Sequence, residues 1–225
     1  MNMKPDPTTL KVLVAAAAVR EVPDGCVLGV GTGSTVDCFI DALAAARKPL
    51  EAAVASSERT RLRLEGHGYR VIDLSDIDQP LSLYVDGADE IDTNLCMVKG
   101  GGAALTREKI VASASERFVC IVDQSKCVEV LGRFSLPIEA IAMALKPVSW
   151  ALERLGGRPV VRAGVLTDNG NPIIDVHGLV LASPFDWEDR LNAIPGVVTN
   201  GIFARQRASL ALVASPEGVQ RRTPQ

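Results

Sequence analysis

The chain has 225 residues, enough for one large domain or for a medium-sized domain beside a small one. Apolar residues make up 47% of it and charged residues 23%, the balance of a globular protein that can bury a sizeable core. The net charge of -3 excludes the basic field that binders of nucleic acid and anionic membranes use. An anionic ligand would have to be held locally, by a few lysines and by backbone N–H groups.

The N-terminal residues show no three-part signal peptide, and no apolar run approaches the roughly 20 residues that span a bilayer. The five cysteines are odd in number and form no CxxC pair, so we expect buried thiols rather than disulfides or a zinc site. They are Cys26, Cys38, Cys96, Cys120 and Cys127. Both features indicate a soluble protein of the reducing cytoplasm.

The first half of the chain alternates between helix and strand patterns. A helix is predicted over 8–22, where Leu10, Leu13 and Val14 have helical spacing and Pro23 ends the pattern. Strands are then expected over 26–30, 52–56, 81–85, 96–99 and 118–123, and helices over 35–46, 57–65 and 103–117. This alternation predicts an α/β fold, a doubly wound and mostly parallel sheet with helices on both faces. Ligands of such sheets bind beyond the carboxyl ends of the strands.

From about Gly132 the pattern changes to strands joined by a hairpin, with two helices. Strands are expected over 136–141, 160–167, 173–176 and 197–203, and helices over 148–155 and 186–194. The turn 168–171 (Asp-Asn-Gly-Asn) is typical of a hairpin. We expect residues 132–206 to form a small α+β (ferredoxin-like) domain that serves oligomerisation. A strand over 209–214 is expected to return to the first sheet, so residues 1–131 and 207–225 would form the catalytic domain, with a disordered tail over 220–225.

The first candidate site is the glycine-rich turn from Gly29 to Thr35. It follows a strand and opens a helix, where free N–H groups favour an anion. The spacing is GxGxG rather than GxGxxG, and the next strand ends in Ser56 and Ser57 rather than in an acidic residue that would hold a ribose. A phosphate or sugar loop is therefore favoured over a dinucleotide site, and a ligand-free capping turn is the remaining alternative. The candidate residues are Thr32, Gly33, Ser34 and Thr35.

The second candidate is the acidic segment from Tyr84 to Asp92, which follows the predicted strand 81–85. Asp86 falls at the carboxyl end of this strand, where the sheet should bind its ligand. A solvated acidic turn and a magnesium site are the alternatives, because hard cations prefer carboxylate oxygens. The two histidines, His67 and His177, are far apart in sequence, which argues against a zinc site. The candidate residues are Asp86, Gly87, Ala88 and Asp89.

The third candidate is the run Gly100, Gly101 and Gly102, which lies between a strand and a helix. Three consecutive glycines are costly to order, but they can present several N–H groups to an anion or to a developing oxyanion. Lys99 ends the strand and would add a positive charge at the same place. Lys126 also follows an apolar strand, and it repeats the position of Lys99 on what should be another strand of the same sheet.

Glu108 is the most informative residue of the chain. On a helix from Ala103, its neighbours three and four positions away are apolar, so Glu108 lies in line with the buried face. They are Ala104, Leu105, Val111 and Ala112. Burial raises the pKa of a carboxyl group toward the range of a useful base at neutral pH. The alternative is a glutamate at the edge of this face, paired with a nearby lysine.

These segments resemble ribose-5-phosphate isomerase of the A type over almost the whole chain. The similar stretches are 29–35, 84–91, 99–109, 155–159, 167–171 and 192–198. The resemblance implies reversible conversion of ribose 5-phosphate to ribulose 5-phosphate without a cofactor, in the non-oxidative branch of the pentose phosphate pathway. It implies Glu108 as proton acceptor, with Asp86 and Lys99 as further catalytic residues and the other candidates in contact with the sugar phosphate. It also implies a homodimer or homotetramer.

Two departures from the family pattern limit what is carried over. The segment 56–60 differs from the usual serine-rich form, so no site residue is taken from it, and Cys127 receives no role. Three other functions stay open on the residues alone: a sugar-phosphate sensor, an acyl or CoA transferase acting through a covalent intermediate on Glu108, and a dehydrogenase. A sensor that regulates genes would normally carry a basic DNA-binding element, which is absent before the first predicted strand.

Overall fold

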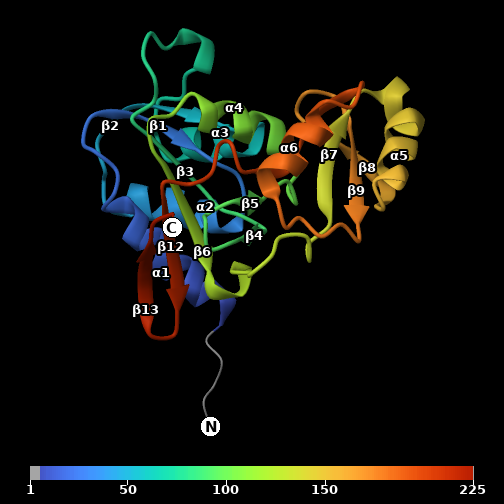
Figure 1. Ribbon diagram of the computed structural model, residues 1–225. Helices are drawn as coiled ribbons and strands as arrows, with labels where there is room; N and C mark the ends of the chain where they lie inside the picture. The colour runs from blue at the N-terminus through green and yellow to red at the C-terminus, as the bar shows by residue number, and fades with distance from the viewer. Residues whose placement is uncertain (1–5, 225) are drawn as a thin grey trace.

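A computed structural model describes residues 6–224, and a six-stranded sheet forms the larger part of it (Figure 1). The strands of this sheet are β1 (Cys26–Val30), β2 (Leu50–Ala55), β3 (Leu83–Asp86), β6 (Phe118–Asp123), β12 (Leu210–Ser215) and β13 (Gly218–Arg222). Their order is β13-β12-β6-β3-β1-β2, and all neighbours are parallel except the β12–β13 pair. The mostly parallel α/β sheet predicted from the sequence is confirmed.

Both faces of the large sheet are buried. Helices α1 (Pro7–Val19), α2 (Ser34–Ala45) and α3 (Glu58–Gly66) contribute to the core on one face, together with Leu28 and Val30 of β1. Helix α4 (Leu105–Ser113) packs against the other face, where Tyr84 and Cys120 belong to the same apolar cluster as Val111. Parallel strands covered on both faces read as continuous apolar runs, and all six residues of β6 are buried.

The order in which strands are added to the sheet reverses at β1. The strand β2 lies on one side of β1, while β3 lies on the other. The loops that follow β1 and β3 therefore leave the sheet side by side at their carboxyl ends. In open α/β sheets this is the place where ligands bind.

A three-stranded sheet corrects one prediction. Residues 96–99 were expected to form a strand of the parallel sheet, but β5 (Met97–Val98) lies between β4 (Glu90–Ile91) and β11 (Ile202–Phe203) in an antiparallel sheet of its own. Lys99 and Lys126 are thus not on two strands of one sheet. The apolar run was too short to reveal its pairing partner, because buried strands of either kind look alike in sequence.

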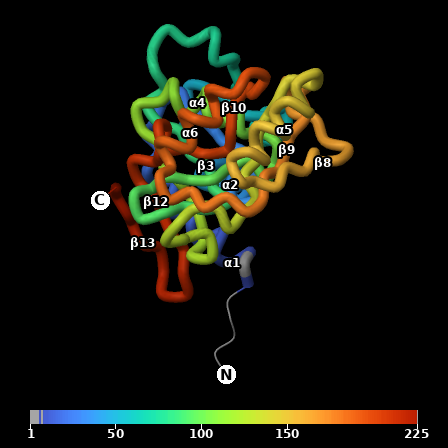
Figure 2. The backbone as a smooth tube through the Cα atoms, turned by 45° about the vertical axis from the view of Figure 1, so that its right-hand side comes forward, coloured from blue at the N-terminus to red at the C-terminus, as the bar shows by residue number. Residues whose placement is uncertain are grey.

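The remaining part of the chain forms a four-stranded antiparallel sheet with two helices. The elements are β7 (Leu136–Ala140), α5 (Leu145–Arg154), β8 (Arg158–Leu166), β9 (Pro172–His177), α6 (Pro184–Asn192) and β10 (Val197–Asn200), with the strand order β10-β7-β9-β8. This β-α-β-β-α-β sequence is the ferredoxin-like arrangement. Figures 1 and 2 show α5, β8 and β9 standing away from β12 and β13, so this unit projects beside the large sheet. We call it the small unit.

Two further predictions are wrong in detail. The strand expected over 197–203 breaks at Gly201, where a Cβ would lie 2.3 Å from the Lys99 carbonyl oxygen, and its two halves join different sheets. The tail was expected to be disordered from Gln220, yet β13 pairs with β12 up to Arg222. The polar residues of β13 are those of an exposed edge strand, a pattern that resembles a disordered tail.

The remaining sequence predictions concern solvent and membrane exposure. The five cysteines are free thiols, two of them buried and three half-buried. Within residues 6–224, no helix has the length and apolar character needed to cross a membrane. The N-terminal residues before Asp6, which showed no signal-peptide pattern, and the last residue of the tail lie outside the described part of the chain.

Candidate active site

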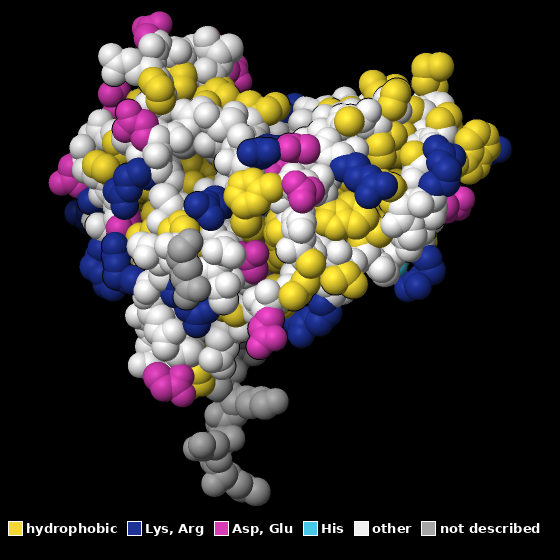
Figure 3. Space-filling model, in the orientation of Figure 1, with side chains coloured by type: hydrophobic (Ala, Val, Ile, Leu, Met, Phe, Trp, Pro, Cys, Tyr) yellow, Lys and Arg dark blue, Asp and Glu magenta, His cyan; other side chains and the backbone are white. Residues whose placement is uncertain are grey.

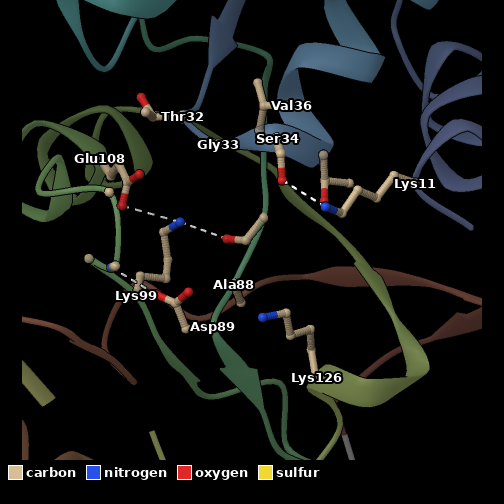
Figure 4. Close-up of a pocket in the computed structure, with 15 residues that line it drawn as sticks. Lys11, Thr32, Gly33, Ser34, Val36, Ala88, Asp89, Lys99, Glu108 and Lys126 are labelled. Atoms are coloured by element: carbon tan, nitrogen blue, oxygen red, sulfur yellow. Dashed lines mark hydrogen bonds and ion pairs between the residues drawn. The ribbon is translucent and has the colours of Figure 1, made fainter. Parts of the chain in front are cut away.

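A cavity of about 150 Å³ lies at the carboxyl ends of β1 and β3, where the strand order reverses (Figure 4). A cavity of this size suits a small polar molecule. Most of its lining comes from the three predicted segments. The lining residues are Lys11, Thr32, Gly33, Ser34, Thr35, Val36, Gly87, Ala88, Asp89, Lys99, Gly100, Gly101, Gly102, Glu108 and Lys126.

The loop after β1 has glycines because the chain passes very close to Asp86. A Cβ on Gly31 would lie 1.9 Å from Cγ of Asp86, so only glycine fits there. The same carboxylate accepts hydrogen bonds through Oδ1 from the N–H groups of Thr32 (3.1 Å) and Gly87 (2.7 Å). Asp86 thereby ties the two loops together at the edge of the sheet.

Lys99 lies at the centre of a buried charge cluster. Its Nζ is 2.7 Å from Oδ2 of Asp86 and 3.2 Å from Oε2 of Glu108, and it donates a 2.6 Å hydrogen bond to the Gly87 carbonyl. Burial lowers the pKa of Lys99, but attraction to Asp86 and Glu108 outweighs this and holds the pKa above its ordinary value. The ammonium group therefore stays charged beside the cavity.

Glu108 lies on the buried face of α4, as the helical spacing predicts, and only 3% of it is exposed. Burial raises the pKa of Glu108 to about 8, and the negative charge of Asp86 adds to this, while Lys99 opposes it. The contact of Glu108 Oε2 with Lys99 is an ion pair without hydrogen-bond geometry, and no donor among the described residues satisfies this oxygen. A buried carboxylate in this state is a competent proton acceptor near neutral pH.

The glycine run forms the wall of the cavity next to Glu108. Gly100 has φ of +109°, a backbone conformation that favours glycine. The N–H of Gly101 donates a 2.9 Å hydrogen bond to Oδ2 of Asp89, which lies on the opposite loop. The run thus brings backbone dipoles and the Asp89 carboxylate to the same side of the cavity as Lys99.

Two lysines lie at the other end of the cavity. Lys11 of α1 donates a 2.9 Å hydrogen bond to Oγ of Ser34, the first residue of α2. Lys126 ends the turn after β6 and lines the same cavity. Figure 4 shows both amino groups on the opposite side of the cavity from Glu108. The N-terminus of α2 adds its free N–H groups, so this end is suited to an anion.

Thirteen of the fourteen predicted site residues line the cavity, and Asp86 is the exception. Asp86 is fully buried behind Lys99, and its Oδ2 also accepts a 2.5 Å hydrogen bond from the Tyr84 hydroxyl. The sequence placed it correctly at the end of a strand, but not behind the lysine.

Sequence reasoning missed residues on three elements, α1, α2 and α3. Lys11 and Val36 line the cavity, and nothing in the local sequence of α1 distinguishes Lys11 from a solvated lysine. In the segment 56–60, Ser57 caps α3 and its hydroxyl lies 2.8 Å from Oγ1 of Thr32, while Thr60 donates to the Gly31 carbonyl. The Ser-x-x-Thr spacing at a helix start was a usable signal for this support of the loop.

The chain resembles known proteins over almost its full length. The family model described as ribose 5-phosphate isomerase A (phosphoriboisomerase A) matches residues 52–218. A relative named ribose-5-phosphate isomerase A from Methylibium petroleiphilum is 53% identical over 211 residues, covering 94% of this chain and 96% of its own.

Solved structures agree with this similarity. The crystal structure of ribose 5 phosphate isomerase A from Neisseria gonorrhoeae has a TM-score of 0.97 at 43% identity, covering 99% of this chain and 100% of its own. A D-ribose-5-phosphate isomerase in complex with phospho-erythronic acid has a TM-score of 0.93 at 36% identity, covering 97% and 100%.

Proposed function

We propose that Glu108 moves the proton in the reaction of this chain, which belongs to the ribose 5-phosphate isomerase A family. The reaction interconverts ribose 5-phosphate and ribulose 5-phosphate, a step of the pentose phosphate pathway. The reaction shifts one proton between C1 and C2 of the open-chain sugar through an enediolate. The observation that carries the proposal is the state of Glu108. It lines the cavity yet is almost fully buried, it has a raised pKa, and no donor among the described residues satisfies its Oε2.

The groups around Glu108 supply the charge stabilisation that the enediolate needs. In the aldose-to-ketose direction, Glu108 takes the proton from C2, and negative charge develops on the oxygen of C1. Glu108 then returns the proton to C1, and the hydroxyl proton on the oxygen of C2 passes to the oxygen of C1, which leaves the carbonyl at C2. Lys99 and the N–H groups of the glycine run lie on this side of the cavity. Fixed donors at the position where charge develops are worth several kcal/mol, about 3–4 for one oxyanion donor.

The phosphate group of the substrate belongs at the other end of the cavity. Lys11, Lys126 and the first turn of α2 gather there, and their donors match phosphate oxygens. This orientation places C1 and C2 beside Glu108. It also predicts that phospho-erythronic acid binds here, with its carboxylate in place of the enediolate oxygens.

Ring opening of the furanose requires a second proton transfer. Asp89 lines the cavity, whereas Asp86 is covered and contacts Lys99 instead. We assign the proton transfer to Asp89 and the positioning of Lys99 to Asp86. The test is the rate at which Asp86→Asn converts the ring form and the open-chain form of the substrate. If conversion of the ring form is slowed much more, Asp86 itself opens the ring and this division of roles is wrong.

The decisive experiment is ketose formation from ribose 5-phosphate in the presence of a chelator. The test variant is Glu108→Gln, and Glu129→Gln is its control. The control makes the same substitution at a glutamate that is exposed and does not line the cavity. Loss of about 10²- to 10⁴-fold is expected for Glu108→Gln, the usual contribution of a positioned base, and no loss for Glu129→Gln. Full activity of folded Glu108→Gln would remove Glu108 from the role. Loss of wild-type activity in the chelator, restored by Mg²⁺, would indicate a metal-dependent reaction.

The assembly and location of the protein are further proposals. We propose a homodimer or homotetramer in which residues 132–206 make the subunit contact, beside a catalytic domain of residues 1–131 and 207–225. The exposed apolar residues of the small unit support this, among them Met143, Trp150 and Val160. In Figure 3, apolar side chains gather at the upper right, where Figure 1 shows α5. The free thiols favour the reducing cytoplasm.

A further inference from the structure

An arginine of the small unit contacts the glycine run from outside the cavity. Nη1 of Arg162, on β8, donates to the carbonyl oxygens of Gly100 (3.1 Å) and Gly101 (3.2 Å). Arg162 is not among the residues that line the cavity. One guanidinium nitrogen therefore binds the carbonyl oxygens of two consecutive peptide groups, and these peptide groups belong to the wall of the cavity.

The guanidinium group is itself held in place. Asp175 of β9 accepts from Nε (2.8 Å) and from Nη2 (2.5 Å), a bidentate pair in which both side chains are 17% exposed. The regular pairing of β8 with β9 ends at Val161, which pairs with Ile174, and the register has shifted when pairing resumes at Leu166. Arg162 is the first residue of this irregular stretch. Such irregularities re-aim side chains near active sites. Only Nη1 is then left for the glycine run.

The two contacts fix the direction of the backbone N–H groups. In a trans peptide the C=O and N–H bonds point in opposite directions. Because both carbonyls point to Arg162, the N–H groups of Gly101 and Gly102 point away from it. The Gly101 N–H meets Asp89, and Gly102 lines the cavity. Without Arg162, the Gly100–Gly101 peptide would still be held by the Ala103 N–H, which donates to the Gly100 carbonyl (3.0 Å), and by Asp89. The Gly101–Gly102 peptide would lose the one hydrogen bond that its carbonyl makes among the described residues, and glycine has the widest choice of backbone conformation.

We propose that Arg162, oriented by Asp175, is a positioning residue that holds the Gly102 N–H group toward the enediolate oxygen. The inference rests on the proposed role of the glycine run in charge stabilisation. It assigns the small unit a part in the reaction that is separate from subunit contact.

Other contacts already join the small unit to the large sheet, so Arg162 is not needed for that purpose. Glu139 of β7 accepts a hydrogen bond from Thr106 of α4, and within the small unit Thr167 and Asn171 hold the Glu139 carboxylate in place. The Lys109–Glu188 ion pair adds a second connection, with 2.6 Å between Nζ and Oε1. Loss of Arg162 should therefore affect the glycine run more than the docking of the two parts.

The test compares Arg162→Met, Asp175→Asn and the control Arg158→Met. Arg158 is an exposed arginine on the same strand and does not contact the glycine run. For Arg162→Met we expect kcat for ribose 5-phosphate to fall about 10- to 100-fold, the scale of a misplaced catalytic group, with KM changed less than about twofold. A smaller fall in kcat is expected for Asp175→Asn, and none for Arg158→Met. Unchanged kcat in both Arg162→Met and Asp175→Asn overturns the proposal.

Ligand binding separates positioning from a general loss of structure. Phospho-erythronic acid should bind Arg162→Met more weakly, by about the same factor as kcat falls, whereas inorganic phosphate should bind as in the wild type because it needs only the other end of the cavity. Equal weakening of both ligands would mean that Arg162 serves the fold alone, and overturns the proposal. If Glu108→Gln stays active, the proposed mechanism fails. If Glu108→Gln is inactive while Arg162→Met and Asp175→Asn are fully active, only the role of Arg162 fails.

Discussion

Glu108 is a residue whose catalytic usefulness should cost the protein stability. Its pKa is about 8 in the folded chain and near 4.5 for an ordinary glutamate. Between these values the folded state holds a proton that the unfolded state has lost, so the stability contributed by this residue falls as pH rises through this range. Each pH unit of the range contributes on the order of 1 kcal/mol. Above pH 8 the loss is complete.

Glu108→Gln should therefore be more stable than the wild type, and the difference should grow with pH. The glutamine does not titrate, so the gain in Tm is expected to be small near pH 4.5 and largest above pH 8, with about 2–4 °C for every kcal/mol. Thermal unfolding across this pH range, with Glu129→Gln as control, measures the effect. A difference in Tm that is constant over pH would show that the folded pKa of Glu108 is not raised.

Asp86 provides a second prediction at this scale, because its charge is a cause of the raised pKa of Glu108. Glu108 must be deprotonated to accept the proton, so kcat/KM should rise with pH up to about 8. In Asp86→Asn the repulsion is absent, and the acidic limb of the pH profile should move to lower pH while the maximal rate falls. If the acidic limb stays at the same pH or moves to higher pH, the charge of Asp86 does not raise the pKa of Glu108. The profile of kcat/KM is the proper measurement because it reports the free enzyme.

The positions of single residues were predictable from the sequence where periodicity determines them. The apolar neighbours of Glu108 at three and four positions predicted its burial. Asp86 shows the limit, because the last residue of a strand can face either the ligand or a neighbouring side chain. Its pairing with Lys99 and Tyr84 depends on contacts that sequence spacing does not encode. Lys11 reaches the cavity only because α1 packs beside α2.

At the scale of an element, the loop after β1 depends on the absence of a side chain at Gly31. In Gly31→Ala, the new Cβ would overlap Asp86 and push it from Lys99. We expect a loss of about 1–3 kcal/mol in the free energy of unfolding, as for an overpacked core, together with lower kcat. Gly66→Ala is the matched control, since Gly66 ends α3 and a Cβ there meets nothing within 4 Å. It should change stability by less than about 1 kcal/mol. Chemical denaturation of both variants tests this, and equal stability of the two would refute it.

The sequence did not predict how the shortest strands pair: β5 and β11 lie within the expected strands 96–99 and 197–203, whereas β4 was not expected. The strands β4, β5 and β11 have two residues each, and their pairing brings together segments about 100 residues apart. Periodicity needs a longer window than two residues, so it does not reveal such pairs. The longer buried strands of the large sheet and the helices of both parts were predicted with shifts of a few residues at their ends, which is where caps and packing decide.

At the scale of the molecule, the described residues that line the cavity all come from one end of the chain, from Lys11 to Lys126. The small unit contributes support through Arg162 and Glu139, but no lining residue. The order of elements and the change at Gly132 were visible in the sequence, whereas the contact of Arg162 with the glycine run, 61 residues away, was not.

This arrangement leads to a prediction about assembly. In the small unit, β8 is an edge strand, and Val160 and Leu166 on it are exposed, as is Trp150 on α5. Exposed apolar edge strands pair with other chains unless they are covered. We therefore expect the wild-type protein to have a solution mass of two or four times 23.9 kDa at micromolar concentration. Trp150→Glu combined with Val160→Glu should move the mass toward a single chain, because two charges would be buried in the contact.

The control for this experiment is Leu62→Glu, which places a charge on an exposed apolar position of α3 instead. It should leave the mass unchanged. Because Glu108, Lys99 and the glycine run lie outside the small unit, the dissociated variant should keep kcat within a few fold of the wild type. A single-chain mass for the wild type would contradict the predicted contact. A dissociated variant that is folded but inactive would mean that subunit contact supports the cavity, through the same strand that carries Arg162.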